Sequence, residues 1–286
     1  CLQKTPITVE QKANLFQMAA DSTASSIKEK AEELLPALKE ELGSEADGVN
    51  DDNLLKFLYW KQDLRRASDR FRHHIKWRKE HSYAFDDTPL FASKDPELKR
   101  VLESEVLVAP EGLVCKEGST VVIGRLRNND MADGRTATSV ARMFFYTIDR
   151  ILERDSTKFH GMTIFHDLTG LSRNNVDPAI PKLVFKGVFG TFPIHIKAVY
   201  IMNPPWFFYS LFKIVSLMWP KKLRSRVHFM DGLDDIYKVI DKDSLLEEHG
   251  GKRAHDTIKW VESQMAKEES GSIDSLYYCL PNTTKE

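Results

Sequence analysis

Apolar residues recur along this chain at two different spacings, and the spacing changes near residue 105. Before that point they recur every three or four positions, which is typical of an amphipathic helix. The stretch "SSIKEKAEELLPALKEEL" predicts one such helix, which Pro36 should kink or split. Its apolar face contains Ile27, Ala31, Leu34, Leu38 and Leu42.

Two further helices are predicted before residue 105. "GSEADGVNDD" has the composition of a linker, and Asp51 or Asp52 is a candidate cap for a helix in "NLLKFLYWKQ". The next helix is predicted in "LRRASDRFRHHIKWRKEH", with apolar residues on one face and basic residues on the other. The apolar face contains Leu64, Ala67, Phe71 and Ile75. We expect the basic face to be solvated.

After residue 105, short apolar runs alternate with helical patterns. Strands are predicted in "STVVIGRLR", "MTIFHDL", "IKAVYIMN" and "RVHFMDG". Helices are predicted between them in "TATSVARMFFYTIDRILER" and "DPAIPKLVFKGVFG". Because such alternation implies crossover connections, the sequence predicts an α/β fold with a mainly parallel sheet flanked by helices.

These patterns divide the chain into four regions. We expect a helical extension over residues 1–50, an N-terminal helical layer over 51–104, an α/β lobe over 105–251, and a C-terminal helix with a polar tail over 252–286. The predicted fold is therefore a helical layer followed by a sheet-containing lobe.

Charge and cysteine content limit the class of protein. Lysine and arginine (41) balance aspartate and glutamate (42), so the chain lacks the global basic field of a nucleic-acid-binding protein. Any affinity for anions must come from local clusters. Cys1, Cys115 and Cys279 lie far apart without a CxxC pair, and the first residues show no secretory pattern. We therefore expect reduced thiols and a cytoplasmic location.

Motifs of catalysis are missing from the sequence. It contains no GxSxG elbow, P-loop, GxGxxG or HExxH pattern, and no cluster of residues at metal-ligand spacing. We predict that the chain is not an enzyme and requires neither a metal nor a cofactor.

One segment, "PPWFFYSLFKIVSLMWPKKLRSR" at residues 204–226, is far more apolar than the rest. As a helix it has a single narrow polar stripe, formed by Ser210, Lys213 and Ser216. Its fifteen residues from Pro205 to Trp219 would rise only about 22 Å, against a hydrocarbon core of about 30 Å. The length therefore argues against a membrane span.

Two other interpretations of this segment stay open. It is either an ordinary buried helix or a helix with an apolar partner on each side, namely a bound lipid inside and a bilayer outside. The basic residues Lys221, Lys222, Arg224 and Arg226 follow it directly. They could meet anionic lipid head groups, or they could simply pair with the helix dipole and solvent.

Three segments resemble the CRAL-TRIO lipid-binding family. They are "LLKFLYWKQDLRRASDRFRHHIKWRKEH", "GMTIFHDLTG", and "FPIHIKAVYIMNPPWFFYSLFKIVSLMWPKKLRSRVHFMDG" continuing to "LLEEHGG". Their order and spacing cover about residues 50 to 251. The resemblance implies an N-terminal helical layer and an α/β lobe whose sheet floors an apolar cavity, with residues Trp206 to Trp219 forming a mobile gate helix.

The resemblance also implies a set of ligand-binding residues. On the predicted strands and crossover helix these are Phe144, Thr163, Phe165 and His166, to which we add Val199 and Ile201 from the neighbouring strand. On the gate they are the side chains opposite the polar stripe, namely Phe207, Phe208, Leu211, Phe212 and Val215. His166 and Asp167 are strand neighbours that point to opposite faces, so they cannot form a catalytic dyad.

A second set of implied residues is basic. Lys61, His195, Lys197, Lys222 and Arg226 fall where one branch of the family contacts phosphoinositides, and His195 and Lys197 are expected on one side of a strand. In the phosphatidylinositol-transfer branch a glutamate follows the proline of a "YPE" stretch, whereas here Ile194 follows Pro193. This departure counts against an inositol head group inside the cavity.

The function implied is that of a carrier. The chain is expected to bind a retinoid, a tocopherol, a phospholipid or another hydrophobic molecule in a gated cavity and to transfer or present it at anionic membranes. The bound lipid would be cargo, the membrane association transient, and no nucleic acid is expected as a partner. An alternative function is a lipid-regulated protein-interaction module or phosphoinositide sensor whose protein partner is unknown.

Overall fold

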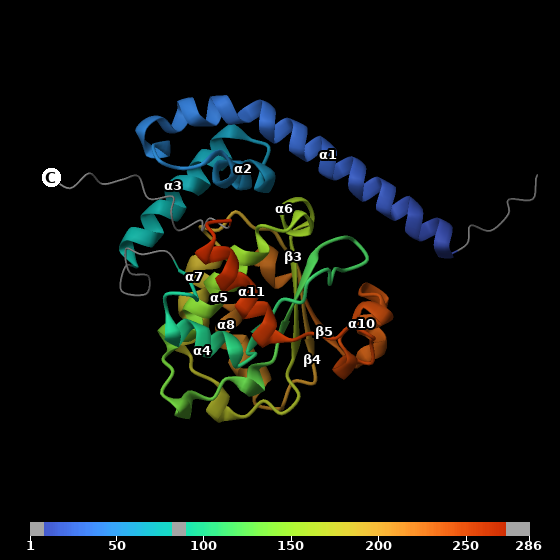
Figure 1. Cartoon of the computed structure of the whole chain (residues 1–286). Coiled ribbons are helices and arrows are strands. Elements are labelled where there is room, and N and C mark those ends of the chain that lie inside the picture. The colour runs from blue at the N-terminus through green and yellow to red at the C-terminus, as the bar shows by residue number, and fades with distance from the viewer. Residues whose placement is uncertain (1–8, 82–89, 273–286) are drawn as a thin grey trace, which may run out of the picture.

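A computed structural model describes residues 9–81 and 90–272 of the chain. Figure 1 shows a layer of helices above an α/β lobe. The helical layer consists of α1 (Val9–Leu42), α2 (Asp51–Trp60) and α3 (Leu64–Glu80). The α/β fold expected from the alternating pattern is confirmed.

The lobe is built on a five-stranded sheet in the order β1-β2-β3-β4-β5. The short β1 is antiparallel to β2, and all other neighbours are parallel. The strands are β1 (Leu107–Val108), β2 (Thr120–Gly124), β3 (Met162–Asp167), β4 (Ile196–Met202) and β5 (Val227–Met230). Parallel neighbours require crossover connections, which the helices between the strands supply.

Most helices of the lobe cover one face of the sheet (Figure 1). These helices are α4 (Pro96–Glu103), α5 (Ala137–Ile151), α7 (Ala179–Val188), α8 (Phe208–Ser216) and α11 (Thr257–Glu269). The opposite face packs against α10 (Leu233–Val239) and the segment after it, through Ile236, Ile240 and Leu245. Two shorter helices, α6 (Asp155–His160) and α9 (Lys221–Arg224), precede β3 and β5. The sheet therefore has two separate apolar layers, one on each face.

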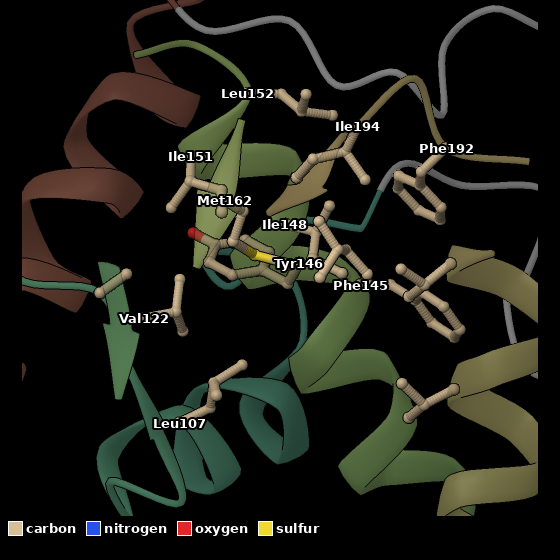
Figure 2. Close-up of a cluster of buried hydrophobic side chains, with 14 of the residues drawn as sticks. Leu107, Val122, Phe145, Tyr146, Ile148, Ile151, Leu152, Met162, Phe192 and Ile194 are labelled. Carbon is tan, nitrogen blue, oxygen red and sulfur yellow. The ribbon is translucent and has the colours of Figure 1, made fainter. Parts of the chain in front are cut away.

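Alternation along each strand decides which layer a residue joins. Val122, Met162 and Ile164 face the large layer, whereas Val121 and Phe165 face the small one. Figure 2 shows Leu107, Val122, Ile148 and Met162 from the sheet and from α5 pointing toward one another. Residues two apart in a strand share a face, so this layer follows from the strand period.

A bulge changes the register at the start of β4. Met162 pairs with Ile196 but Thr163 pairs with Ala198, which leaves Lys197 without a partner in the ladder. One inserted residue exchanges the faces of the sheet to which the following side chains point. Ile196 and Val199, three positions apart, therefore both belong to the large apolar layer.

Aromatic side chains and a partly buried ion pair fix the helical layer to the lobe. The ring of Trp77 on α3 meets the ring of Phe145 on α5 edge-on, with 5.1 Å between centroids. Phe145 stacks on Phe192 at 5.6 Å between centroids, and both are labelled in Figure 2. The buried ammonium of Lys56 on α2 pairs with Glu153 beyond α5. Helical layer and lobe consequently share one hydrophobic core.

Two local features differ from the predictions. Helix α1 continues through Pro36, so the predicted split at this residue does not occur. The cap of α2 is Asn50, whose side chain accepts a hydrogen bond from the Asn53 amide at 2.8 Å, rather than Asp51 or Asp52. These two aspartates instead occupy the first helical turn, where carboxylates favour the positive end of the helix dipole. The predicted polar tail beyond residue 272 lies outside the described residues.

Candidate functional site

An apolar cavity of about 190 Å³ lies between the sheet and the helices that cover it on the side of the large apolar layer. Its floor is formed by side chains of β2, β3 and β4, and its walls come from α5, α7 and α8. Of the predicted ligand-binding residues, those that line it are Phe144, His166, Val199, Ile201, Phe208, Leu211, Phe212 and Val215. These predicted residues come from α5, β3, β4 and α8, which are far apart in the sequence and meet around one space.

Two predicted lining residues on β3 face away from the cavity. Thr163 is buried on the opposite side, where its hydroxyl lies 2.9 Å from that of Ser119. Phe165 packs in the small apolar layer against the ring of His249, with centroids 5.0 Å apart. The prediction was wrong because it put Phe165 and His166 on one face, although adjacent strand residues point to opposite faces. Met162 and Ile164 line the cavity instead.

Asp167 also belongs to the far side of β3. Its carboxylate lies 3.3 Å from the His249 ring nitrogen and accepts hydrogen bonds from the Thr169 amide and hydroxyl. Although its partial burial opposes ionisation, these hydrogen bonds hold the pKa of Asp167 well below its usual range. The carboxylate therefore ties the segment around His249 to the sheet, and His166 and Asp167 act separately, as the strand geometry predicts.

Helix α8 has apolar side chains on both sides. Phe208, Leu211 and Phe212 face the cavity, and the ring of Phe212 meets Trp219 edge-on with 5.6 Å between centroids. On the outer side, Ile214 and Leu217 are 67% and 74% exposed. Trp206, Tyr209 and Met218 add to this outer surface. Such a helix is neither an ordinary surface helix nor a buried one.

The chain entering α8 has an unusual conformation. Asn203 adopts a positive φ of 54°, and its side-chain amide donates a hydrogen bond to the Thr169 hydroxyl at 2.9 Å. Phe207, the residue directly before α8, does not line the cavity, in contrast to the prediction. Its ring instead lies edge-on to Trp206 and 5.8 Å from the Arg173 guanidinium.

A second hollow, the cationic groove, lies where the helical layer meets the lobe. It has a volume of about 410 Å³ and is lined by Lys61, Arg66, Arg70, Lys222 and Arg226, together with Trp60 and His195. None of these five cations pairs with a carboxylate in the described part of the chain. Uncompensated cations around a concave surface attract anions.

Stacked rings hold the floor of the cationic groove. The Arg70 guanidinium lies 4.0 Å from the centre of the Trp60 ring, and Trp60 stacks on His195 at 5.8 Å. Burial lowers the pKa of Arg70 to about 10. A His195 ring nitrogen lies 2.6 Å from the Trp60 carbonyl. Burial is the main cause that lowers the pKa of His195 to about 4, with Lys197, Lys61 and Arg226 adding to it, so this ring is neutral at pH 7.

Lys197 does not line the cationic groove with His195, and this prediction was wrong. The bulge at the start of β4 leaves Lys197 unpaired and exposed. Sequence reasoning also missed Arg66 and Arg70, which were assigned to a solvated helix face. Their four-residue spacing puts both on one side of α3, but the strand they face is more than a hundred residues away. Only the tertiary fold brings these elements together.

The cavity and the cationic groove share a wall. Val188, Phe189 and Ile196 line both spaces. Phe189 stacks on Phe185 at 5.1 Å and lies 6.2 Å from Trp219, which follows α8. A displacement of this wall therefore changes both spaces.

The model of the CRAL/TRIO domain matches residues 115–251. The chain thus contains a CRAL-TRIO domain. The prediction of this family from three sequence segments is confirmed. The matched range includes β2 to β5 and helix α8. Trp60, Lys61, Arg66 and Arg70 of the cationic groove lie outside it, on or beside the helical layer.

Relatives of the CRAL-TRIO domain carry several names. An alpha-tocopherol transfer protein-like protein of mouse is 30% identical over 138 residues, which are 46% of this chain and 40% of that protein. The tyrosine-protein phosphatase non-receptor type 9 of human is 26% identical over 121 residues, 42% of this chain and 20% of that protein. A CRAL-TRIO domain-containing protein of Dictyostelium discoideum is 24% identical over 221 residues, 71% of this chain and 79% of that protein. This chain thus spans less than half the length of the first two.

A solved structure supports the fold beyond the CRAL-TRIO domain itself. The crystal structure of Sfh5 superposes with a TM-score of 0.51 and 14% identity over 86% of this chain and 98% of that one. At this identity the likeness concerns the fold alone. Across residues 9–81 and 90–272, no helix is both long and apolar enough to span a membrane. The same residues contain no cluster of three or more His, Cys, Asp or Glu suited to a metal ion.

Proposed function

We propose that this chain binds one small hydrophobic molecule or lipid in its apolar cavity and transfers or presents it at membranes. The observation that carries the proposal is a cavity with an almost wholly apolar wall beneath a helix that is apolar on both sides. A concave apolar space with a few polar atoms is the usual form of a small-molecule site. The CRAL-TRIO domain and the transfer proteins among its relatives support the same function.

Helix α8 is the proposed gate. The cavity volume of about 190 Å³ is below the roughly 300 Å³ at which small-molecule sites usually begin, so a lipid-sized occupant requires the wall to move outward. Opening in water exposes the inner side of α8, at about 25 cal/mol for each Å² of apolar surface. A bilayer that receives its exposed outer side chains removes much of this cost. Membrane contact and cargo exchange would therefore occur together.

The cationic groove is the proposed contact with anionic head groups. Lys222 lies on α9, directly after the gate, so an anion bound there acts next to the moving helix. Each cation near an anionic surface contributes about 1 kcal/mol, which suits reversible docking rather than permanent anchorage. Five such side chains supply enough attraction for a peripheral membrane protein that keeps its cargo in a separate space.

The proposal is tested by native mass spectrometry of the purified protein, followed by organic extraction and identification of what is bound. One stoichiometric hydrophobic molecule, such as a retinoid, a tocopherol or a phospholipid, is the expected result. Absence of bound lipid from protein made both in bacteria and in a native source contradicts the carrier function.

A second candidate function is a lipid-regulated interaction module or phosphoinositide sensor. It is favoured by the relative named as a tyrosine-protein phosphatase, in which the similar region is a fifth of the length, and by the cationic groove. Vesicle sedimentation combined with a lipid-transfer assay separates the two functions. A carrier moves labelled cargo between vesicle populations, whereas a sensor binds vesicles containing phosphoinositide without moving lipid.

A further inference from the structure

Residues that line the apolar cavity carry buried polar atoms that no part of the described chain satisfies. His166 Nδ1, Asn129 Oδ1 and Trp219 Nε1 are buried without a hydrogen-bond partner among the described residues, and all three residues line the cavity. Buried polar atoms are normally paired, because leaving them unpaired costs their lost hydration. These three positions are therefore candidates for contacts with a ligand.

Two of the three residues lie at the same end of the sheet. Gly124, the last residue of β2, pairs with His166 near the end of the adjacent parallel strand β3. Asn129 follows β2 by five residues. Trp219 instead packs against Phe185 at 4.9 Å, on the side of the cavity that adjoins the cationic groove. The cavity thus has one end with two unpaired polar residues and another with a single indole.

The surrounding chain holds both polar side chains in place. A Cβ atom on Gly124 would lie 2.1 Å from His166 Nδ1, so the imidazole occupies space that only glycine leaves open. The Asn129 side-chain amide donates a hydrogen bond to the Asn175 carbonyl at 2.8 Å. This bond identifies the nitrogen of the amide and leaves Oδ1 as the free acceptor. The unpaired atoms are therefore fixed rather than free to rotate toward protein partners.

The charges around this end are unsuited to an anion. Among the described residues that line the cavity none is lysine or arginine, and Asp177 supplies a carboxylate. Burial alone lowers the pKa of His166 to about 4, so its ring is neutral at pH 7. A phosphate or carboxylate here would be buried without a counter-charge, which is costly. A hydroxyl group, in contrast, can donate a hydrogen bond to Asn129 Oδ1 or accept one from a neutral imidazole.

We infer that the end of the cavity formed by His166 and Asn129 is a polar subsite that selects cargo with one neutral hydrogen-bonding group, such as a lipid alcohol. This inference rests on the proposed function and specifies its cargo class. The subsite discriminates against plain hydrocarbons, which leave both side chains unpaired, and against anionic lipids, which lack a partner charge. The hydrocarbon part of the cargo extends toward Trp219.

The experiment compares dodecanol, dodecane and dodecanoate as competitors that displace a fluorescent apolar probe from the full-length protein. Wild-type protein is expected to bind dodecanol about tenfold more tightly than either of the others, the effect of one hydrogen bond. His166→Phe should lower the ratio of dodecanol affinity to dodecane affinity severalfold, because only Asn129 Oδ1 then remains as a polar partner. His166→Gln, which restores a hydrogen-bonding group, should keep part of the preference. His228→Phe is the matched control, because His228 lies exposed on β5 away from the cavity.

Each outcome has a distinct meaning. If no competitor displaces the probe from wild-type protein, the proposed carrier function fails. Equal affinities, or a preference for dodecanoate, overturn the polar subsite and leave the carrier function standing. A preference for dodecanol that is undiminished in a folded His166→Phe variant removes His166 from the subsite. The comparison of the three competitors on wild-type protein tests the inference even where a variant does not fold.

Discussion

The apolar cavity and the cationic groove lie on either side of one wall, yet their chemistry is opposite. The cavity has no lysine or arginine among its described lining residues, whereas the groove has five cations without carboxylate partners. The cavity is built almost wholly within the CRAL-TRIO domain, while the groove needs the helical layer as well. The fold therefore keeps the space proposed for a neutral cargo apart from the groove proposed to bind anions. Substitutions should be able to disturb one space and spare the other.

The largest effect is expected from a charge placed on the inner side of α8, the proposed gate. Phe208→Asp puts a carboxylate into the apolar wall, and its desolvation should weaken cargo retention by about a hundredfold or more. Cargo retention is measured by release of a fluorescent lipid. The matched variant is Tyr209→Asp, one residue along, on the exposed side of α8. It should weaken membrane binding and leave retention near the wild-type value; equal losses in both variants would contradict the two-sided gate.

Next in size is the effect of crowding the polar end of the cavity. Gly124→Ala places a Cβ atom against the His166 ring and should lower the free energy of unfolding by about 1–3 kcal/mol while displacing the imidazole. Thermal unfolding and alcohol binding should both change, and binding of a soluble inositol phosphate in the cationic groove should not. Gly190→Ala is the control, because no atom lies within 4 Å of its added Cβ. A loss of inositol phosphate binding in Gly124→Ala would show that the two spaces are not separable.

A smaller effect is expected in the cationic groove. Lys61→Ala combined with Lys222→Ala removes two cations at about 1 kcal/mol each, which corresponds to a roughly thirtyfold weaker attachment to anionic vesicles. Salt dependence should fall as well, since fewer charges are screened. Cargo retention in the absence of vesicles should be unchanged. Lys252→Ala with Lys259→Ala is the control, because both lysines are exposed and paired with nearby aspartates. Equal loss in the control would mean that total charge, not the groove, governs docking.

The smallest effect concerns pH. The pKa of His195 is lowered to about 4 from an ordinary 6.5 in the free groove, mainly by burial and also by neighbouring cations. A bound anion favours the protonated ring and raises this pKa, so binding takes up protons. Affinity for an anionic head group should therefore rise severalfold as pH falls from 7 toward 5. Calorimetry with inositol phosphate measures this trend, and His195→Gln should flatten it. A trend that persists in His195→Gln would assign it to another group.

Most of the fold could be predicted from the sequence, because strand and helix periods are local signals. The strands in "MTIFHDL" and "IKAVYIMN" and the α-helix between them lie where apolar spacing indicated. Continuity of α1 through Pro36 was not predictable in this way, since packing against α2 and α3 supports a helix that local propensity would interrupt. The Asn50 cap was missed because three neighbouring residues all have capping side chains.

The candidate site was less accessible to sequence reasoning. The inner side of α8 was predictable from its polar stripe, and Phe208, Leu211 and Phe212 line the cavity. Family resemblance assigned Thr163 and Phe165 to the cavity together with His166, although alternation along the strand puts them on the opposite face from His166. The polar end of the cavity was invisible, because the free atom of Asn129 is defined by a hydrogen bond to Asn175. The bulge at Lys197 likewise depends on pairing between strands, which no single segment encodes.

The wall formed by Val188, Phe189 and Ile196 is common to both spaces, so binding in the cavity and binding in the groove are thermodynamically linked. If a bound anion changes the affinity for cargo by some factor, bound cargo must change the affinity for the anion by the same factor. A membrane that loosens the cargo must therefore hold the empty protein more tightly than the loaded one. An exchange cycle with a direction set by lipid composition then needs no energy source other than the difference between two membranes.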